Sequence, residues 1–552
     1  MSENAADHAQ QADPGGPAQA PPPPPAPGLP GHERTAWLLY QHQLRQRQLR
    51  EEAEARAANS MWRRIRPADA APIRTVTLAA ALGAGLAAAV LLGDGVGPGL
   101  LLAALPAMVA AYAAARAAGR KARPWSLVWA AGCAALLAVP ALRDSAWPST
   151  LAVLAAVPLA ALALHGTRRW PGVVLGPLGF LDSAVSGVGW AWAGVRARGG
   201  GTGREHWLPI AKAAVVGAVL LLLFGALFAS ADAAFADLLG GLVPDVSVGE
   251  GPLRILLFLA GAVLALAAAR SAAAPHRWDR MKSRPGTPRS RLEWSLPLIL
   301  LNLLFAGFNA VQLAVLFGGY DKVLESTGLS HAQYARQGFW QLLWATVLVL
   351  AVIALALRWA PRGTAADRRL VRAVLGTLCL LTLVVVASAV RRMDLYVAAF
   401  GLTRLRLSVV TTELWLGLVI LLLMAAGAAG GRWLARAVVA SAAATVLAFG
   451  LVSPDGIVAE AGVARYQRDG EIDLVYLRGL SADAVPALDR LPEPQRSCAL
   501  LSIRDDLRRA GEVPWYATSL GESRARRILR ERPLTADRDA CVRRDLYTGR
   551  RP

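Results

Sequence analysis

The sequence predicts an all-α, polytopic membrane protein with about 10–12 transmembrane helices, because two features exclude a soluble domain and a disordered chain. Of its 552 residues, 55% are hydrophobic and 18% are charged, whereas soluble domains average about 25% charged residues. The apolar residues also gather in long blocks between Arg74 and Val452. A block of roughly 20 apolar residues is long enough to cross a bilayer.

Two polar segments precede these blocks. Residues 1–32 are rich in Pro, Ala and Gln and include a proline run from Pro21 to Pro25. We expect a disordered tail with polyproline II character, and not a signal peptide, because no basic segment precedes an apolar one. Residues 33–74 begin with a stretch rich in Leu, Gln, Arg, Glu and Ala, which favour helix. This predicts a basic juxtamembrane helix, either solvated or docked onto anionic lipid or a cytosolic partner.

About eleven apolar blocks of suitable length predict a transmembrane domain over residues 75–453. The stretch 170–192 is also apolar but contains Pro171, Pro177 and Asp182. It is therefore a re-entrant or interfacial element, or else a further span. The predicted spans cover residues 75–93, 97–117, 125–142, 148–165, 208–229, 252–269, 295–317, 339–357, 372–390, 407–428 and 434–452.

The distribution of charge predicts the orientation. Basic connections recur near 116–123, 168–204, 270–291 and 358–372, and cytoplasmic loops carry the excess of Arg and Lys. We therefore expect a multi-pass protein of a bacterial plasma membrane with its N-terminus in the cytoplasm. Because an odd number of spans places the two ends on opposite sides of the membrane, we expect the C-terminus to be extracytoplasmic.

The same distribution bears on the partners. The net charge is +20, of which the residues before Pro454 carry +18. Because the positive-inside rule accounts for this charge, we expect no nucleic-acid partner. The expected partners are the lipid bilayer and anionic lipids at its cytoplasmic face, while protein partners stay open.

Residues 454–552 predict a small, helical, soluble C-terminal region. Helical patterns cover 481–491, 493–511 and 521–533, and the region contains Cys498 and Cys541. Because disulfides persist outside the cytoplasm, we expect these cysteines to form a bridge. The alternative is two buried thiols in a cytoplasmic domain.

The sequence contains no catalytic, nucleotide-binding or zinc-binding motif, so it predicts no catalytic residue, metal or cofactor. Polar residues at membrane depth are the main candidates, because their burial is costly. Glu413 follows Arg406 by seven residues, either as a structural ion pair or as a proton or ligand site. Asn302, Asn309 and Gln312 share one helix face, where they either form interhelical hydrogen bonds or line a polar cavity.

A second candidate is an outer charged cluster in the segment 391–407, which is basic although it is predicted to lie outside. It either holds an anionic headgroup or anchors to lipid phosphates. Its members are Arg391, Arg392, Asp394 and Arg404, which the nearby Asp232 and Asp237 could face.

Three sequence blocks resemble a bacterial family of polytopic membrane proteins, the DUF4173/DUF4153-type family. They are LLFGALFASADAAFADLL (222–239), AAFGLTRLRLSVVTTELWLGLVI (398–420) and GIVAEAGVARYQRDGEIDLVYLRGLSADAVPAL (456–488). The resemblance extends over roughly 205–490. It implies an integral membrane protein with many spans and supplies no activity. The Ala- and Arg-rich composition also resembles that of an actinobacterium.

Three functions are compatible with these features. The leading hypothesis is a transporter or permease-like protein with a polar intramembrane site, because discontinuous spans and buried polar residues often form binding sites. The alternatives are a non-enzymatic sensory or scaffolding envelope protein, and a membrane-embedded enzyme acting on lipid-linked substrates. We expect a protein without enzymatic activity rather than an enzyme.

Overall fold

The computed structural model describes residues 37–52, 65, 67, 69–121, 123–198, 251–281, 290–318, 339–360 and 363–543. The chain forms two units, residues 1–64 and 65–552. In the first unit, residues 37–52 form a largely exposed helix, within the segment for which a basic helix is expected. Residues 1–32, the span predicted at 208–229, Asp232 and Asp237 lie outside the described residues.

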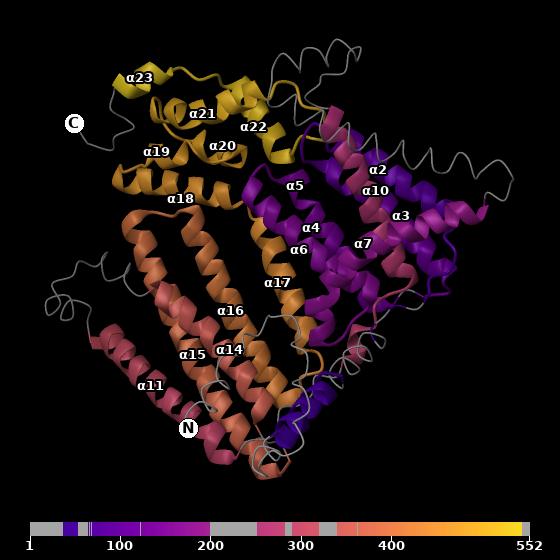
Figure 1. Cartoon of the computed structure of the whole chain (residues 1–552). Helices are drawn as coiled ribbons and strands as arrows, with labels where there is room; N and C mark the ends of the chain where they lie inside the picture. The colour runs from indigo at the N-terminus through magenta and orange to yellow at the C-terminus, as the bar shows by residue number, and fades with distance from the viewer. Residues whose placement is uncertain are drawn as a thin grey trace, which may run out of the picture. The chain divides into compact units, whose positions relative to one another are not determined.

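The second unit confirms an all-α, multi-span membrane protein. Within the described residues, ten helices are long and apolar enough to cross a membrane, and Thr75–Leu91 is a shorter apolar helix. No strand occurs in this part of the chain. The helices shown in Figure 1 are α2 (Thr75–Leu91), α3 (Pro98–Ala117), α4 (Pro124–Leu137), α5 (Val139–Leu142), α6 (Ala146–His165), α7 (Trp170–Arg198), α10 (Gly251–Ala273), α11 (Arg291–Gly318), α14 (Phe339–Trp359), α15 (Ala365–Phe400), α16 (Arg404–Ala429) and α17 (Leu434–Leu451).

Local sequence explains where several of these helices begin. Pro98 and Pro124 occupy the first turns of α3 and α4, where the missing N–H costs no hydrogen bond. Thr364 and Asp367 form a reciprocal capping box at the start of α15. The hydroxyl of Thr403 accepts a main-chain hydrogen bond at the start of α16. Each cap satisfies donors that an uncapped helix end leaves unpaired.

The stretch 170–192, for which the sequence left a re-entrant element, an interfacial element or a further span open, lies in a single continuous helix, α7. It contains Pro177 in its interior, and its residues 170–197 qualify as a membrane span. The structure therefore shows one continuous apolar helix of spanning length here.

The basic segment 391–407 is not an outer loop. Helix α15 continues through it to Phe400 and spans 36 residues. After a connection of three residues, 401–403, the next spanning helix begins at Arg404. Most of the charges in this segment thus lie on helix ends, which explains why they acquire separate partners.

The apolar helices pack in three groups. Helices α2, α3, α7 and α10 pack through small residues, such as Ala81, Ala84 and Ala265. Helices α4, α5, α6 and α17 share a core that includes Trp129 of α4. Helices α11, α14, α15 and α16 share a core that includes Leu378. The last group carries all the intramembrane polar residues that the sequence indicates.

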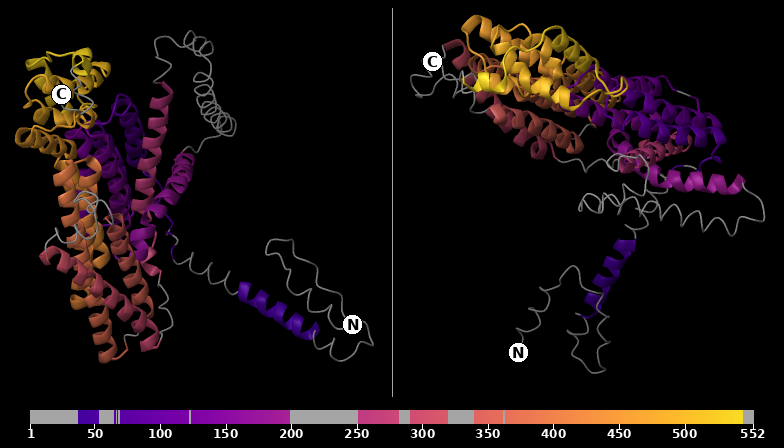
Figure 2. Two further views of the ribbon diagram at one scale, coloured as in Figure 1. Left: turned by 90° about the vertical axis from the view of Figure 1, so that its left-hand side faces the viewer. Right: turned by 90° about the horizontal axis from the view of Figure 1, so that it is seen from above.

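The C-terminal helices form a domain with its own apolar core. They are α18 (Pro454–Asp469), α19 (Leu474–Leu477), η3 (Ala482–Ala484), α20 (Val485–Leu488), α21 (Gln495–Arg509), α22 (Leu520–Glu531) and α23 (Arg538–Arg543). Figure 2 shows this domain beyond one end of the spanning helices. Cys498 and Cys541 form a disulfide inside its core.

We call the end of the spanning helices that contacts the C-terminal domain the domain end. There, the main-chain N–H of Gly99 donates to the carbonyl of Tyr516 at 2.7 Å. The guanidinium of Arg404 donates to Asp455. Figure 1 shows α18 directly beyond the ends of α15, α16 and α17.

The other end of the same helices is the opposite end. Arg120 donates there to the carbonyls of Leu164 and Ala272. The N–H of Arg277 donates to the carbonyl of Ile65 at 3.0 Å. The chain therefore enters the helical bundle at the opposite end and leaves α17 at the domain end.

Candidate functional site

Two asparagines predicted to share one face of a spanning helix join α11 to α15. The side-chain amide of Asn302 donates to the carbonyl of Val374 at 3.0 Å. About two helical turns later, Asn309 donates to the carbonyl of Leu381 at 2.9 Å. The amide oxygens of Asn302 and Asn309 are buried and accept no hydrogen bond. The structure thus shows interhelical hydrogen bonds and leaves two unpartnered acceptors beside them.

Gln312 continues this stripe toward the domain end. Its side-chain oxygen accepts hydrogen bonds from the hydroxyl of Ser388 at 3.0 Å and from Arg392 at 2.9 Å. Arg392, which the sequence assigns to an outer cluster, is buried. Its charge is therefore directed into the α11–α15 contact and not toward an external headgroup.

Glu413 lies on the buried face of α16, and its side chain is fully buried. Neither carboxyl oxygen has a hydrogen-bond partner. The same face carries Leu416, Gly417 and Ile420, and a Cβ added at Gly417 would lie 3.3 Å from Val386 of α15. Glu413 is nine residues after the start of α16, about 13 Å along the helix. An isolated carboxyl group therefore lies at membrane depth in an apolar contact.

The expected partner of Glu413 lies elsewhere. The guanidinium of Arg406 lies over the ring of Tyr396, 4.2 Å from its centroid, and donates to the carbonyl of Gly401. Both contacts are with the end of α15 or the connection after it. Arg406 therefore fixes the α15–α16 turn and does not form a direct ion pair with Glu413.

The remaining charges of the predicted outer cluster are also dispersed. Arg391 pairs with Asp394 on the exposed surface of α15 at 2.8 Å. Arg404 forms a bidentate ion pair with the fully buried Asp455, at 2.7 and 2.6 Å. Within the described residues, these side chains thus form separate contacts and no common headgroup site.

The Arg404–Asp455 pair joins α16 to the C-terminal domain. The main-chain N–H of Arg404 also donates to the hydroxyl of Tyr476 at 2.8 Å, and the N–H of Ser481 donates to Asp455 at 2.9 Å. Burial raises the pKa of Asp455, but the hydrogen bonds from Arg404, Ser145 and Ser481 outweigh it and hold the pKa at about 2. This carboxylate is therefore ionised at neutral pH.

A second contact joins the α5–α6 connection to the domain. The N–H groups of Asp144 and Ser145 donate to one oxygen of Asp483 at 3.0 and 3.1 Å. In return, the N–H of Ala482 donates to Asp144 at 2.9 Å. The other oxygen of Asp483 is buried without a partner. Burial, with the nearby charge of Asp144, raises the pKa of Asp483 to about 6, so this carboxyl group titrates closer to neutral pH than an ordinary aspartate.

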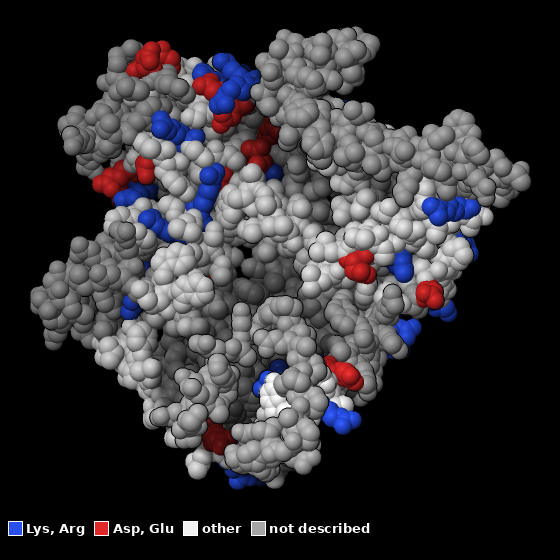
Figure 3. Space-filling view, viewed as in Figure 1, with Lys and Arg blue, Asp and Glu red and all other residues white. Residues whose placement is uncertain are grey.

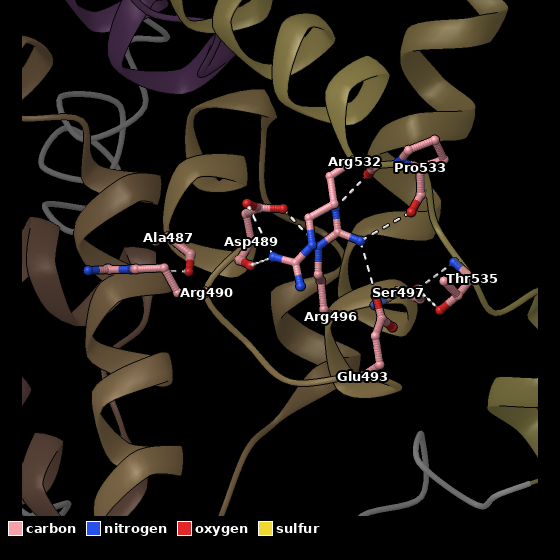
Figure 4. Close-up of polar contacts among 9 residues, drawn as sticks. All are labelled: Ala487, Asp489, Arg490, Glu493, Arg496, Ser497, Arg532, Pro533 and Thr535. Atoms are coloured by element: carbon pink, nitrogen blue, oxygen red, sulfur yellow. Dashed lines mark hydrogen bonds and ion pairs between the residues drawn. The ribbon is translucent and has the colours of Figure 1, made fainter.

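Inside the C-terminal domain, the fully buried Arg496 connects three segments (Figure 4). It donates to Asp489 at 2.7 Å, to Glu493 at 3.0 Å and to the carbonyl of Arg532 at 2.6 Å. Sequence reasoning missed this residue because one arginine among many carries no signal of burial. Figure 3 shows acidic and basic side chains close together over this domain.

Sequence reasoning also missed two buried histidines at the opposite end, because an isolated histidine carries no signal of burial. His165 and His276 are both buried, with ring centroids 5.7 Å apart. His276 pairs with Asp182 of α7 at 3.1 Å. Among the described residues, no group of three or more His, Cys, Asp or Glu side chains is arranged to hold a metal ion.

Comparison with known proteins assigns the chain to a family. The model of a domain of unknown function, DUF4153, matches residues 130–491, which is more than half of the chain. The match begins upstream of the region 205–490 for which the sequence shows a resemblance. It includes Glu413, Arg404, Asp455 and Asp483. No curated protein and no solved structure matches the chain. The protein belongs to the DUF4153 family of proteins with a domain of unknown function.

Proposed function

We propose that this protein is a transporter or permease-like membrane protein in which Glu413 binds and releases a proton during each cycle. The observation that carries this proposal is the carboxyl group of Glu413, which is fully buried and has no hydrogen-bond partner on either oxygen. Ionisable groups at membrane depth are costly, and they commonly form ion or proton pathways.

The energetic argument concerns the two charge states of Glu413. An unpaired carboxylate in apolar surroundings costs several kcal/mol. The packing between α16 and α15 therefore favours the neutral acid, and release of the proton requires that water or a hydrogen-bond donor reach the side chain. A movement of α16 relative to α15 would supply that access and would couple the proton to a change of conformation.

Two further acceptors support a binding site in the same helix group. The amide oxygens of Asn302 and Asn309 are buried and unpartnered, and both side chains are held by their amide hydrogens on α15. Fixed acceptors of this kind suit a solute that donates hydrogen bonds. The α11–α15–α16 group is thus the part of the molecule in which we place the transport site.

Proton uptake into proteoliposomes tests the proposal. The purified full chain is reconstituted with a pH-sensitive dye inside, and a membrane potential is imposed. We expect proton entry with the wild type and its loss with Glu413→Gln, which retains the shape of the side chain without its charge. Glu460→Gln is the matched control, because Glu460 is exposed on α18. Equal proton entry with Glu413→Gln and the wild type would contradict the proposal.

We further propose that the domain end is extracytoplasmic and the N-terminus cytoplasmic, in a bacterial plasma membrane. Basic residues at the opposite end, in 116–123, 168–169, 277–280 and 432–436, support this orientation by the positive-inside rule. They also suit anionic lipids of the cytoplasmic face. The Cys498–Cys541 disulfide supports an oxidising compartment for the C-terminal domain.

Thiol labelling of intact cells tests the orientation. Arg509→Cys places a thiol on the exposed surface of α21, and Arg432→Cys places one at the opposite end. We expect a membrane-impermeant maleimide to label only position 509 before the cells are opened. Labelling of position 432 alone would indicate the reverse orientation and would contradict the proposed one.

A second candidate function is that of a sensory protein. One observation favours it: Arg404, through which the C-terminal domain contacts the spanning helices, begins the same helix that carries Glu413. A change in the domain would therefore reach α16 directly. This function predicts that ligands of the C-terminal domain alter the conformation of α16 without any proton uptake.

The enzymatic alternative has less support. Its anionic substrate would need free cations at the domain end, but Arg392 is bonded to Gln312 and Arg404 to Asp455. The carboxylates of Asp144 and Asp483 accept main-chain hydrogen bonds that join the two parts of the structure. These groups are better explained as an interdomain contact than as an active site.

A further inference from the structure

A loop of the C-terminal domain is fixed at the level where the apolar helices α2, α3 and α10 end. The hydroxyl of Tyr516 donates to Asp94 at 2.7 Å, and Asp94 forms an ion pair with Arg254 of α10 at 2.8 Å. The carbonyl of Tyr516 accepts from the N–H of Gly99 at the start of α3. These contacts tie residues 513–519 to the domain ends of α2, α3 and α10.

This loop exposes two large apolar side chains. Trp515 is 69% exposed and Leu520 is 63% exposed, although most of the other large apolar residues of the domain are packed in its core. Because Tyr516 is hydrogen-bonded at the domain ends of α2 and α3, its neighbour Trp515 lies next to the level at which these helices end. Tryptophan is enriched at that depth, where its ring contacts both apolar chains and polar headgroups.

Helix α22 continues the same surface with positive charge. Leu520, Arg524 and Arg527 are spaced four and three residues apart, so they share one helix face, and all three are exposed. The buried side of the helix carries Ala525 and Glu522. An exposed stripe that begins with an apolar residue and continues with arginines is typical of a surface that binds anionic lipid.

We propose that Trp515, Leu520, Arg524 and Arg527 form a lipid-binding surface that holds the C-terminal domain against the leaflet on its own side of the membrane. Trp515 and Leu520 enter the boundary between headgroups and acyl chains, and the two arginines bind phosphates of anionic lipids. Two observations favour a bilayer as the occupant. The loop that carries Trp515 is hydrogen-bonded through Tyr516 to the domain ends of α2 and α3, and the charge of the two arginines complements that of anionic headgroups.

The experiment places a fluorescent label at this surface in the full chain. Leu520→Cys is labelled with an environment-sensitive dye in a background in which Cys133 and Cys379 are replaced by Ala, and the protein is placed in lipid nanodiscs. Arg509→Cys is the matched control, because it is exposed on α21, beyond α18 as seen from the spanning helices (Figure 1). We expect lipid-borne quenchers to quench the label at 520 and not at 509.

The charge requirement is tested with the same labelled protein. Quenching at position 520 should be stronger in nanodiscs that contain phosphatidylglycerol than in those of phosphatidylcholine alone. Arg524→Gln with Arg527→Gln should abolish that difference. Equal quenching by a water-soluble quencher at 520 and 509 would overturn the proposal, because the surface would then face water. Protection of 520 from both kinds of quencher would also overturn it and would indicate that protein covers the surface.

Discussion

Replacing Asp483 by Asn is expected to remove most of the pH dependence of the contact between the C-terminal domain and the α5–α6 connection. Asp483 accepts hydrogen bonds from the N–H groups of Asp144 and Ser145, and its second oxygen is buried without a partner. An amide at this position can keep the two accepted bonds while it carries no charge. The variant therefore mimics the protonated form of Asp483 at every pH.

The magnitude follows from the shift of the pKa of Asp483 from 3.8 to about 6, caused by burial and by the charge of Asp144. A shift of about two units corresponds to about 3 kcal/mol. Because the folded state raises this pKa, ionisation of Asp483 weakens the contact above about pH 6. The penalty disappears as the pH falls toward 3.8. The pKa of Asp144 is also raised by burial, so it acts in the same direction.

Asp455 acts in the opposite direction but over a different pH range. Its pKa lies at about 2 in the folded state, below the ordinary value of 3.8. The stability that it contributes is therefore present above pH 3.8 and is lost only as the pH falls through about 2. Between pH 4 and pH 8, the net effect is a contact that strengthens as the pH falls.

Hydrogen exchange measures this contact directly, because the N–H groups of Asp144 and Ser145 donate to Asp483. After correction for intrinsic exchange rates, their free energy of opening should be larger at pH 5 than at pH 8 in the wild type. It should vary much less with pH in Asp483→Asn, in which Asp144 still titrates. Asp469→Asn serves as the control, because Asp469 is exposed on α18. Equal opening free energies at the two pH values in the wild type would refute the reasoning.

Three further changes test the packing of the C-terminal domain. Gly521→Ala should destabilise the contact by about 1–3 kcal/mol, measured by the same hydrogen exchange, because a Cβ there would clash with an oxygen of Asp483; unchanged exchange would show that the contact is looser than described. Arg496→Ala should cost about 3 kcal/mol, because it removes one partner of a buried ion pair, and the loss should be visible in denaturant unfolding of the domain. An unchanged denaturation midpoint in Arg496→Ala would contradict a stabilising role for Arg496. Reducing the Cys498–Cys541 bridge, which closes a loop with a sequence separation of 43 residues, should lower the domain's free energy of unfolding by about 4 kcal/mol. If mass spectrometry shows that the bridge is reduced and the free energy of unfolding is unchanged, the bridge does not stabilise the domain.

The membrane fold could be predicted from the sequence because it depends on local composition. Blocks of apolar residues determine where helices such as α6 and α17 lie, and any 20-residue apolar stretch must satisfy its backbone hydrogen bonds internally. The prolines of α7 left that segment ambiguous. Pro177 removes one hydrogen bond without ending the helix when neighbouring helices support it.

The contacts of the candidate site could be predicted only in part. The stripe of Asn302 and Asn309 was visible because a seven-residue spacing places both on one helix face. Its role was decided by carbonyls of α15 that lie 72 residues further along the chain. The pairing of Arg404 with Asp455 was hidden for the same reason: a sequence pattern identifies a charged residue but not its tertiary partner.

Glu413 shows what this difference means for function. Its depth in α16 was predictable from helix geometry, and the expected ion pair with Arg406 was a reasonable inference from their shared face. The ring of Tyr396 and the carbonyl of Gly401 engage Arg406 instead. Glu413 is therefore left without a partner, which makes it the strongest functional candidate among the described residues.

Labelling of Glu413 by dicyclohexylcarbodiimide, located by peptide mass spectrometry, tests the central claim most directly, because this apolar reagent modifies protonated carboxyl groups that it reaches from the membrane. If Glu413 exchanges protons during a transport cycle, the folded wild-type protein in proteoliposomes should be modified at Glu413, and the modification should stop proton uptake. Modification should also decline as the pH rises. If Glu413 reacts only after the protein is denatured, it is a sealed structural group, and the proposed transport function is wrong.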